Sequence, residues 1–279
     1  MQSSSIVSLI EEVEAPCTPF LKWAGGKRWL AKKHLSIFPT QYNRYLEPFL
    51  GSAAIFFALR PKTAILADTN AHLVETYATL QLDWSRVVGL LQRHASLHSD
   101  TYFYKIRASI PSSMFARAAR LIYLNRTCWN GLYRVNTSGR FNVPIGTKDS
   151  VLLETDDFEG IGRALEKVTM MTSDFGPVID LAQKGDLIFA DPPYTVKHDN
   201  NGFIKYNEQL FSWDDQIRLR DCLLKAKKRG AQIVVTNADN HWIRELYAKD
   251  FESIRLERNS VIAGDSKKRG KCAELAFRG

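Results

Sequence analysis

The stretch GDLIFADPPY, residues 185–194, decides the fold class of this chain. Its apolar run LIFA predicts a short buried strand, which stops where an acid, two prolines and a tyrosine follow. Proline has no N–H for a sheet ladder and fixes its own φ, so two in a row end the strand and stiffen the turn. The turn is either a plain loop or a rigid mount for Asp191 and Tyr194.

Four other apolar runs predict further buried strands, at residues 44–49, 63–68, 167–173 and 231–237. Helical stretches lie between several of them, at residues 53–60, 70–81 and 213–229, the last with Ser212 as its N-cap. Alternating strands and helices predict an α/β fold with a mostly parallel sheet covered on both faces. Ligands of such sheets bind beyond the carboxyl ends of the strands.

The alternation fails between residues 77 and 164, where the chain becomes helical and basic. From Thr101 to Lys148 there are eight basic residues and no acidic one, and these eight equal the formal net charge of +8 of the whole chain. Such a segment is typical of a polyanion-binding surface, although a merely solvated basic face has the same composition. Within it, VNTSGRFNV predicts a β-hairpin that turns at Ser138 and Gly139.

Polar residues and glycines follow the first two predicted strands. Phe49 and Gly51 stand where the first strand leads into a helix, which suits a nucleotide-like ligand, although many such turns carry one glycine for steric reasons alone. Asp68 ends the second strand 17 residues later, where an acid either binds ribose hydroxyls or caps the following helix. Ahead of both, Gly25 and Gly26 precede Lys27 without the spacing of a P-loop, and a solvated lysine is the alternative interpretation.

Several classes of protein are excluded by the composition. The first nineteen residues lack a basic start and carry three glutamates, so they do not resemble a secretory signal. No apolar run approaches the roughly 20 residues of a membrane helix. The four cysteines have no paired short spacing, which argues against a zinc site and a disulfide framework. We expect a cytoplasmic protein that needs no membrane and no metal.

The ordered set of these motifs resembles the Dam-type, alpha-group DNA adenine methyltransferases. The resemblance runs from Pro19 onward through FLKWAGGK, YLEPFLGSAA, ILADTNAHLVETY, LNRTCWNGLYRVNTSGRFNVPIG, LIFADPPY and KKRGKCAELAF. It implies a Rossmann-like methyltransferase sheet, S-adenosylmethionine (AdoMet) as cofactor and double-stranded DNA as partner. One departure is visible, because many members have a second glycine near Ala53 where this chain reads Gly51, Ser52, Ala53.

The resemblance assigns the cofactor and the reacting residues. Trp23 and Lys27 would line the AdoMet pocket near its methionine end, and Asp68 would hold the ribose hydroxyls. Asp174 would lie near the cofactor's adenine, although a capping or loop aspartate is the alternative. The full cofactor set is Trp23, Lys27, Phe49, Gly51, Asp68, Asp174 and Asp191.

For catalysis, an adenine amine must lose a proton and become more tetrahedral before it attacks a methyl group. The Asp191 carboxylate and the Pro192 carbonyl can accept its two hydrogens from a turn that the prolines preorganise. Tyr194 would stack on an adenine that is flipped out of the duplex.

The resemblance also assigns the DNA contacts. Trp129 and Asn130 stand where the family inserts an aromatic wedge and its neighbour, and Leu132, Arg134 and Pro144 at positions that touch base edges. Arg134 would bind guanine, with a phosphate contact as the alternative. Phosphate contacts are assigned to Arg126, Lys267, Lys268, Arg269 and Lys271, the last four with a solvated face as the alternative.

The expected organisation is a loosely ordered lead-in at 1–18, an AdoMet-binding catalytic domain at 19–76 and 165–279, and a DNA target-recognition insert at 77–164. The enzyme would act as a monomer or weak dimer on DNA. The hairpin's likeness favours GATC as the methylated site, and the sequence leaves open whether the enzyme accompanies a restriction nuclease. The alternatives are an inactive DNA-binding relative, supported only by the altered GSAA turn, and a methyltransferase acting on RNA or a protein amide.

Overall fold

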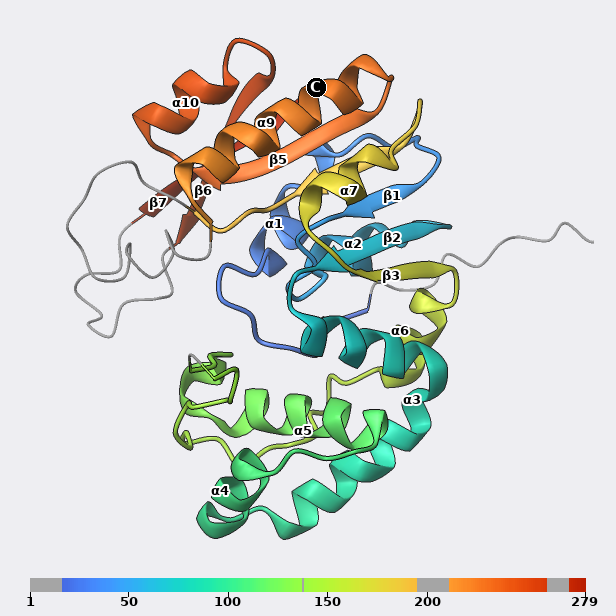
Figure 1. Ribbon diagram of the computed structural model, residues 1–279, viewed down its shortest axis with the longest axis vertical. Helices are drawn as coiled ribbons and strands as arrows, with labels where there is room; N and C mark the ends of the chain where they lie inside the picture. Colours follow the sequence, from blue (N-terminus) through green and yellow to red (C-terminus); the bar gives the residue numbers. More distant parts are fainter. Residues whose placement is uncertain (1–16, 137, 195–210, 260–270) are drawn as a thin grey trace, which may run out of the picture.

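The computed structural model describes residues 17–136, 138–194, 211–259 and 271–279 (Figure 1). A seven-stranded sheet in the order β3-β2-β1-β4-β5-β7-β6 forms its centre. Five strands coincide with the predicted apolar runs: β1 Tyr45–Glu47, β2 Ala64–Asp68, β3 Val168–Thr172, β4 Leu187–Ala190 and β5 Gln232–Ala238. They pair in parallel, as the α/β pattern predicts.

The sequence prediction missed two strands, β6 Glu252–Asn259 and β7 Lys271–Arg278. β7 lies between β5 and β6 and is antiparallel to both. Its residue Glu274 pairs with Ala238 at the last position of β5. The first half of β7 therefore lies at the carboxyl edge of the parallel strands, where β4 ends in the DPPY turn.

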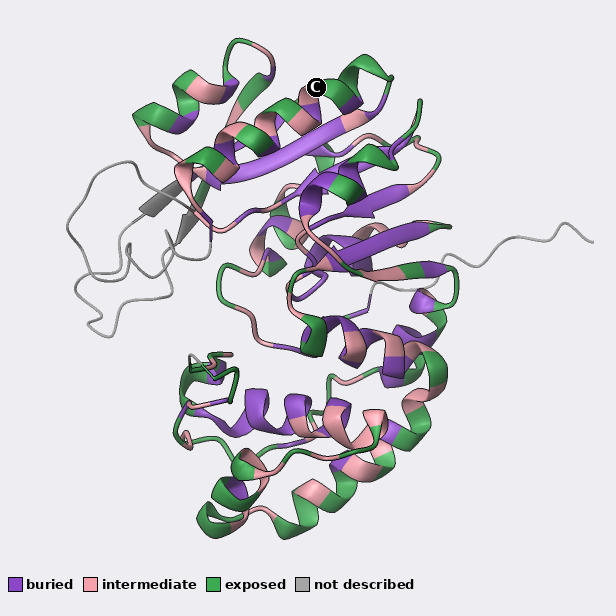
Figure 2. Ribbon diagram, in the orientation of Figure 1, coloured by how far each residue is buried: buried purple, intermediate pink, exposed green. Residues whose placement is uncertain are grey.

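The central strands β1, β2, β4 and β5 bury both of their faces, and the successive side chains of each strand point to opposite sides of the sheet. In β4, Leu187 and Phe189 join the hydrophobic cluster on one face, whereas Ile188 and Ala190 join the cluster on the other. Figure 2 shows the central strands buried along most of their length. These strands are runs of apolar residues and not alternating patterns because neither face is in contact with water.

The helices fall into two groups around the sheet (Figure 1). The face with Ile188 is covered by α7 Phe175–Asp180, α9 Trp213–Lys228 and α10 His241–Tyr247. The other face carries α1 Arg28–Lys33, η1 Leu35–Ile37, α2 Ala54–Leu59 and the start of α3 Ala71–Leu97. Helix α9 begins at the predicted N-cap. The Ser212 side chain accepts a hydrogen bond from the Asp215 backbone N–H, and the Asp215 side chain accepts one from the Ser212 backbone N–H.

The remaining helices are those of the basic segment and its end: α4 Asp100–Ala108, α5 Met114–Thr127, η2 Trp129–Gly131 and α6 Phe158–Leu165. Helix α3 connects them to the sheet, and its helical run is interrupted at Asp83 (φ −161°, ψ 87°). Backbone bonds from Asn136 N–H to Arg140 O and from Gly139 N–H to Asn136 O confirm the predicted hairpin.

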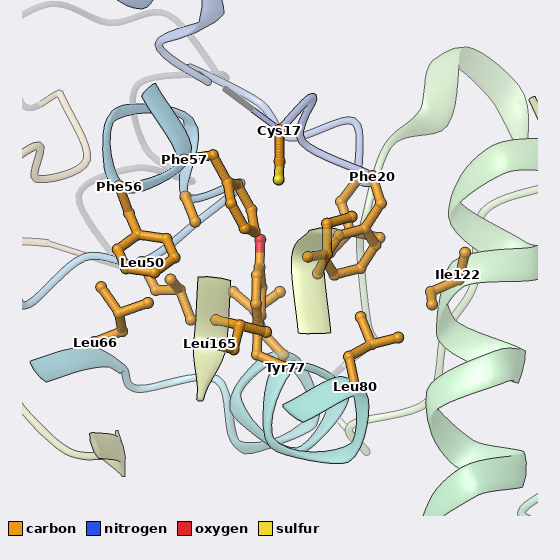
Figure 3. Packing of buried hydrophobic residues seen from close by; sticks show 14 of the residues in the cluster. Cys17, Phe20, Leu50, Phe56, Phe57, Leu66, Tyr77, Leu80, Ile122 and Leu165 are labelled. Atoms are coloured by element: carbon orange, nitrogen blue, oxygen red, sulfur yellow. The ribbon is translucent and has the colours of Figure 1, made fainter. Parts of the chain in front are cut away.

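The basic segment shares its hydrophobic core with the sheet. Figure 3 shows Tyr77 of α3 beside Phe57 of α2 and near Phe20, with Ile122 of α5 in the same cluster. The Phe20 and Tyr77 ring centroids are 5.0 Å apart. No helix in the described part of the chain combines the length and apolar character of a membrane span.

Candidate active site

Five polar side chains meet at the carboxyl edge of the sheet, and we call them the carboxyl-edge cluster: Lys27, Asp191, Tyr194, Thr236 and Glu274. Asp191 directly follows β4, Thr236 belongs to β5 and Glu274 to β7. Lys27 is the N-cap residue of α1 and is only 3% exposed. The interpretation of Lys27 as a solvated lysine is therefore wrong.

Asp191 is held at both of its carboxylate oxygens. Lys27 Nζ lies 2.7 Å from Oδ2, and the Thr236 hydroxyl donates to Oδ1 over 2.8 Å. Burial raises the pKa of Asp191 above its ordinary value, while the ammonium of Lys27 and the Thr236 hydrogen bond oppose that rise. The DPPY turn therefore holds this carboxylate in a fixed position and is not a plain loop.

Glu274 is the member that the sequence prediction did not assign to the site. Its side chain is 3% exposed, and its Oε2 accepts a hydrogen bond from the Tyr194 hydroxyl over 2.5 Å. Lys27 Nζ lies 3.7 Å from the same oxygen and 4.9 Å from the centroid of the Tyr194 ring. An acid in the otherwise apolar, alternating strand CAELAF was the available signal.

A third carboxyl group, Glu47 at the end of β1, lies beneath this cluster. Burial raises its pKa well above the ordinary value, and the negative charge of Asp191 adds to the rise. The Tyr45 hydroxyl donates to Glu47 Oε2 over 2.9 Å. Burial thus favours the neutral form of Glu47.

The turn after β1 requires glycine at position 51. Gly51 has φ +47°, and a Cβ there would lie 2.9 Å from Cδ1 of Trp23. The Trp23 indole in turn stacks on Tyr133 of the basic segment, with ring centroids 5.4 Å apart. Glycine at position 51 therefore allows the turn after β1 and the FLKWAGGK segment to lie close together at this edge.

Asp68 lies beside that turn and accepts the backbone N–H groups of Gly51 (3.3 Å) and Asn70 (2.9 Å). It does not cap the following helix, because Asn70 is the N-cap and accepts from the N–H groups of His72 and Leu73. Burial raises the pKa of Asp68. The Asp68 carboxylate is thus held at the glycine turn by these two backbone groups.

Asp174 follows the capping alternative. It is the N-cap of α7, where its side chain accepts from Gly176 N–H, and both carboxylate oxygens bind the Arg218 guanidinium over 2.7 and 2.9 Å. That ion pair lowers the pKa of Asp174. Phe49 lies nearby, stacked on Phe175 with ring centroids 5.6 Å apart.

The predicted base-contacting residues lie on an exposed turn, residues 129–134. Trp129 is 55% exposed and Leu132 37% exposed, and Asn130 has φ +55°, in the left-handed region. The backbone N–H of Trp129 donates to the Pro144 carbonyl over 2.9 Å, and the Arg134 side chain donates from Nε to Asn142 Oδ1 over 2.8 Å. The structure thus brings the predicted wedge and base-reading residues together on one surface.

The structure contradicts the assignment of Arg126 to a DNA phosphate. Arg126 is 4% exposed, and its guanidinium forms two hydrogen bonds with Asp156, over 2.6 and 2.7 Å. It also donates to the backbone carbonyls of Phe20 and Val151. Arg126 therefore holds segments of the protein together, and its donors point inward instead of toward a partner.

Other bases of the segment are also engaged inside the protein. Arg117 pairs with Glu75, and Arg120 donates to the carbonyls of Ile106 and Arg107 at the end of α4. The absence of acids within the segment therefore overstates its free positive charge, because the counterions come from elsewhere in the chain. Arg134, Arg140 and Lys148 are exposed.

Three predicted phosphate contacts, Lys267, Lys268 and Arg269, lie outside the described residues, and Lys271 begins β7. No group of His, Cys, Asp or Glu suited to a metal ion occurs within the described ranges.

A parallel sheet with one antiparallel strand inserted near its edge, and an Asp-Pro-Pro-Tyr turn beside a glycine turn, define a Rossmann-like methyltransferase. The family described as "D12 class N6 adenine-specific DNA methyltransferase" matches residues 23–262, and the chain belongs to this family. It is accordingly an AdoMet-dependent enzyme that methylates adenine N6 in DNA.

Relatives match nearly the full length of the chain. "Type II methyltransferase M1.LlaDCHI" of Lactococcus lactis subsp. cremoris is 34% identical over 278 residues, which cover 96% of this chain and 98% of the relative. "Type II methyltransferase M.MjaIII" of Methanocaldococcus jannaschii is 31% identical over 90% of this chain and 96% of the relative. "DNA adenine methylase" of Haemophilus influenzae is 30% identical over 92% of each chain.

The residues at the glycine turn fit AdoMet. Gly51 leaves the backbone free of a side chain at the carboxyl edge, and Asp68 supplies carboxylate oxygens, which are acceptors for hydroxyl groups. The Trp23 indole and the Phe49 ring supply apolar surface on either side of that turn.

Proposed function

We propose that this enzyme flips a target adenine out of a short specific duplex sequence, with GATC as the first candidate, and methylates its amine at the carboxyl-edge cluster. The observation that carries the proposal is the meeting of Asp191, Lys27 and Tyr194 at the carboxyl edge of the sheet. Such a site combines a fixed acceptor with an aromatic surface, which the reaction needs in one place.

The reaction needs acceptors because the lone pair of an adenine amine is delocalised into the ring. Asp191 would accept one amine hydrogen and the Pro192 carbonyl the other, so that nitrogen becomes more tetrahedral as it attacks. Because the prolines and Thr236 hold these acceptors in place, little reorganisation is needed during the reaction. AdoMet supplies the methyl group on a positively charged sulfur.

We assign the cofactor to the glycine turn beside this cluster. Asp68 would bind the ribose hydroxyls, and Trp23 and Lys27 the methionine end. Gly51 and Phe49 would line the pocket between them. Asp174 is the remaining prediction, as a neighbour of the cofactor's adenine. Its bonds to Arg218 and to the start of α7 give it a structural role as well.

Base flipping costs a few kcal/mol of unstacking and unpairing. Trp129 would fill the gap in the duplex, with Asn130 beside it, and Tyr194 would stack on the flipped base. The exposure of the Trp129 side chain supports this role only in that the ring is accessible to a partner.

Sequence choice would come from Arg134, whose terminal nitrogens can bind guanine in the major groove, with Leu132 and Pro144 against neighbouring bases. Exposed Arg134 and its bond to Asn142 support this assignment. The GATC site rests on the likeness of the hairpin to the Dam type. Relatives carry both "Type II methyltransferase" and "DNA adenine methylase" as names, so a restriction-linked and a solitary role are both open proposals.

We further propose that residues 77–164 form the target-recognition insert of a catalytic domain made of residues 19–76 and 165–279, and that the enzyme acts on DNA as a monomer or weak dimer. The stacking of Trp23 on Tyr133 would then connect the proposed cofactor pocket with the proposed recognition insert. An inactive DNA-binding relative is not favoured, because Asp191 and its partners are all in place.

Methylation of a plasmid library with the purified enzyme, followed by single-molecule sequencing, tests the proposal. The expected result is N6-methyladenine at the adenine of GATC and nowhere else. Methylation at another short motif would retain the mechanism and replace the site, whereas methylated cytosine or unmodified DNA would contradict the proposed reaction.

A further inference from the structure

We propose that Glu274 is a positioning residue for methyl transfer: it fixes the ring of Tyr194 through the phenol hydroxyl and shares the ammonium of Lys27 with Asp191. The inference rests on the proposed roles of Asp191 and Tyr194. It adds a residue from the far end of the chain, since Glu274 and Tyr194 are 80 positions apart.

A buried carboxylate needs compensation, because transfer of a charge from water into a protein interior is costly. Glu274 lies in a strand whose neighbours Leu275 and Phe277 pack in the cluster on the α9 side of the sheet. Its own side chain points to the opposite face, toward Lys27. The Tyr194 hydroxyl and the Lys27 ammonium, both members of the site, contribute to this compensation.

The first consequence concerns the aromatic ring. Tyr194 follows two prolines that stiffen the backbone but leave the side-chain torsions free. The hydrogen bond to Glu274 fixes the far end of the ring, and the Lys27 ammonium lies over it, 4.9 Å from its centroid. The hydrogen bond and the ammonium together fix where the ring of Tyr194 stands, which sets the position of any base that stacks on it.

The second consequence concerns charge. The groups that face Asp191 are Lys27 before α1, Thr236 on β5 and Glu274 on β7, together with Tyr45 and Glu47 on β1. The negative charge of Glu274 contributes to the raised pKa of Asp191, whereas Lys27 lowers that pKa. Removal of the Glu274 charge should therefore lower the pKa of Asp191, both directly and because Lys27 then pairs with Asp191 alone.

The test compares Glu274→Gln, Tyr194→Phe and the double variant with the wild type. Glutamine retains an oxygen that can accept from Tyr194 but has no charge. We expect Glu274→Gln to lower kcat roughly tenfold, as loss of a charged hydrogen-bond partner does. We also expect the acid limb of the pH profile of kcat/KM to move to lower pH, because the ionised form of Asp191 then persists further into acid.

Tyr194→Phe removes only the hydroxyl and should lower kcat by a smaller factor, with little change in the acid limb. The double variant should lose less than the product of the two single effects, since both act through one hydrogen bond. Glu252→Gln is the matched control. Glu252 is an exposed carboxylate that pairs with Arg278 across β6 and β7, so kcat and the acid limb should both stay at wild-type values.

The inference is overturned if Glu274→Gln keeps the wild-type kcat and acid limb while Asp191→Asn is inactive, because the proposed reaction then stands without Glu274. Active Asp191→Asn enzyme would instead overturn the proposed reaction itself. If urea unfolding shows that Glu274→Gln does not fold, Tyr194→Phe decides the question. Wild-type kcat in that variant would contradict the role of the hydrogen bond.

Discussion

The carboxyl-edge cluster and the exposed turn at residues 129–134 use polar groups in opposite ways. In the cluster, Asp191 is half-buried and Glu274 is buried, and the two bind Lys27, Thr236 and Tyr194. On the turn, Trp129 is more than half exposed, and Arg134 makes one side-chain contact through Nε. The proposed site for chemistry is thus preorganised inside the protein, whereas the proposed site for reading DNA has side chains exposed to a partner.

A buried support lies directly beneath the exposed turn. Asn125 is fully buried, donates to the carbonyls of Lys22 and Gly131, and accepts from the Lys22 N–H. Arg126, the next residue, binds Asp156. The last residues of helix α5 are therefore buried and hold the turn in place, whereas the residues of the turn itself face outward. Substitutions of the buried residues should change stability, and substitutions of the exposed residues should change DNA recognition.

The largest effect is expected for Arg126→Ala. It leaves the carboxylate of Asp156 without its guanidinium and two backbone carbonyls without their donor. Removal of one partner of a buried ion pair costs about 3–5 kcal/mol of unfolding free energy. Urea unfolding followed by circular dichroism measures it, and Arg140→Ala, an exposed base, should stay within about 0.5 kcal/mol of wild type. An unchanged urea midpoint for Arg126→Ala would contradict the structural role of Arg126 and favour its assignment to a DNA phosphate.

A smaller effect, on sequence choice, is expected for Arg134→Ala. Loss of a bidentate guanine contact reduces discrimination by about 1–3 kcal/mol. Ratios of kcat/KM between the proposed site and single-base variants of it measure this discrimination, which should fall in the variant without a change in unfolding free energy. A uniform fall over all DNA sequences would assign Arg134 to a phosphate instead.

A comparable effect, on base flipping, is expected for Trp129→Ala. Its stacking on bases is worth about 1–3 kcal/mol, so single-turnover methylation of a paired duplex should fall about tenfold or more. A target adenine opposite a mismatch costs less to flip, and the loss there should be smaller. Equal losses on paired and mismatched targets would argue against a wedge.

The smallest effect is expected for Ala53→Gly, which restores the glycine found in many members of the family. Ala53 has φ +52°, so it already adopts the left-handed conformation that glycine favours. Relief of about 1–2 kcal/mol of strain opposes about 0.4–1 kcal/mol of chain entropy and about 0.8 kcal/mol of lost methyl burial. The unfolding free energy should therefore shift by less than about 0.8 kcal/mol in urea unfolding, and a larger shift would contradict this estimate.

The five parallel strands were predictable because each is a short apolar run that ends in a turn residue. The prediction failed where contacts depend on residues far apart. The sequence predicts that Arg126 contacts DNA because its segment has no acid, and only the fold shows that Asp156 and Phe20 lie next to it. Glu274 is an isolated acid in the sequence, and it lies near Asp191 only because β7 pairs with β5 in antiparallel orientation. Periodicity reports the local environment of a residue, whereas ion pairs between distant elements follow from topology.

Asp174 and Asp68 illustrate the same limit within one sheet. Both follow a strand and precede a helix, so the sequence allows a cap or a ligand at each. The structure separates them, because Asn70 caps the helix after Asp68, whereas Asp174 is itself the cap of α7.

The central claim is that the Asp191 carboxylate accepts a hydrogen of the adenine amine, and Asp191→Asn tests it most directly. Single-turnover transfer from radiolabelled AdoMet to a GATC duplex is the measurement, with a gel shift to follow DNA binding. We predict a fall of about a hundredfold or more in the rate of transfer, with DNA binding retained. Transfer at the wild-type rate would contradict the account.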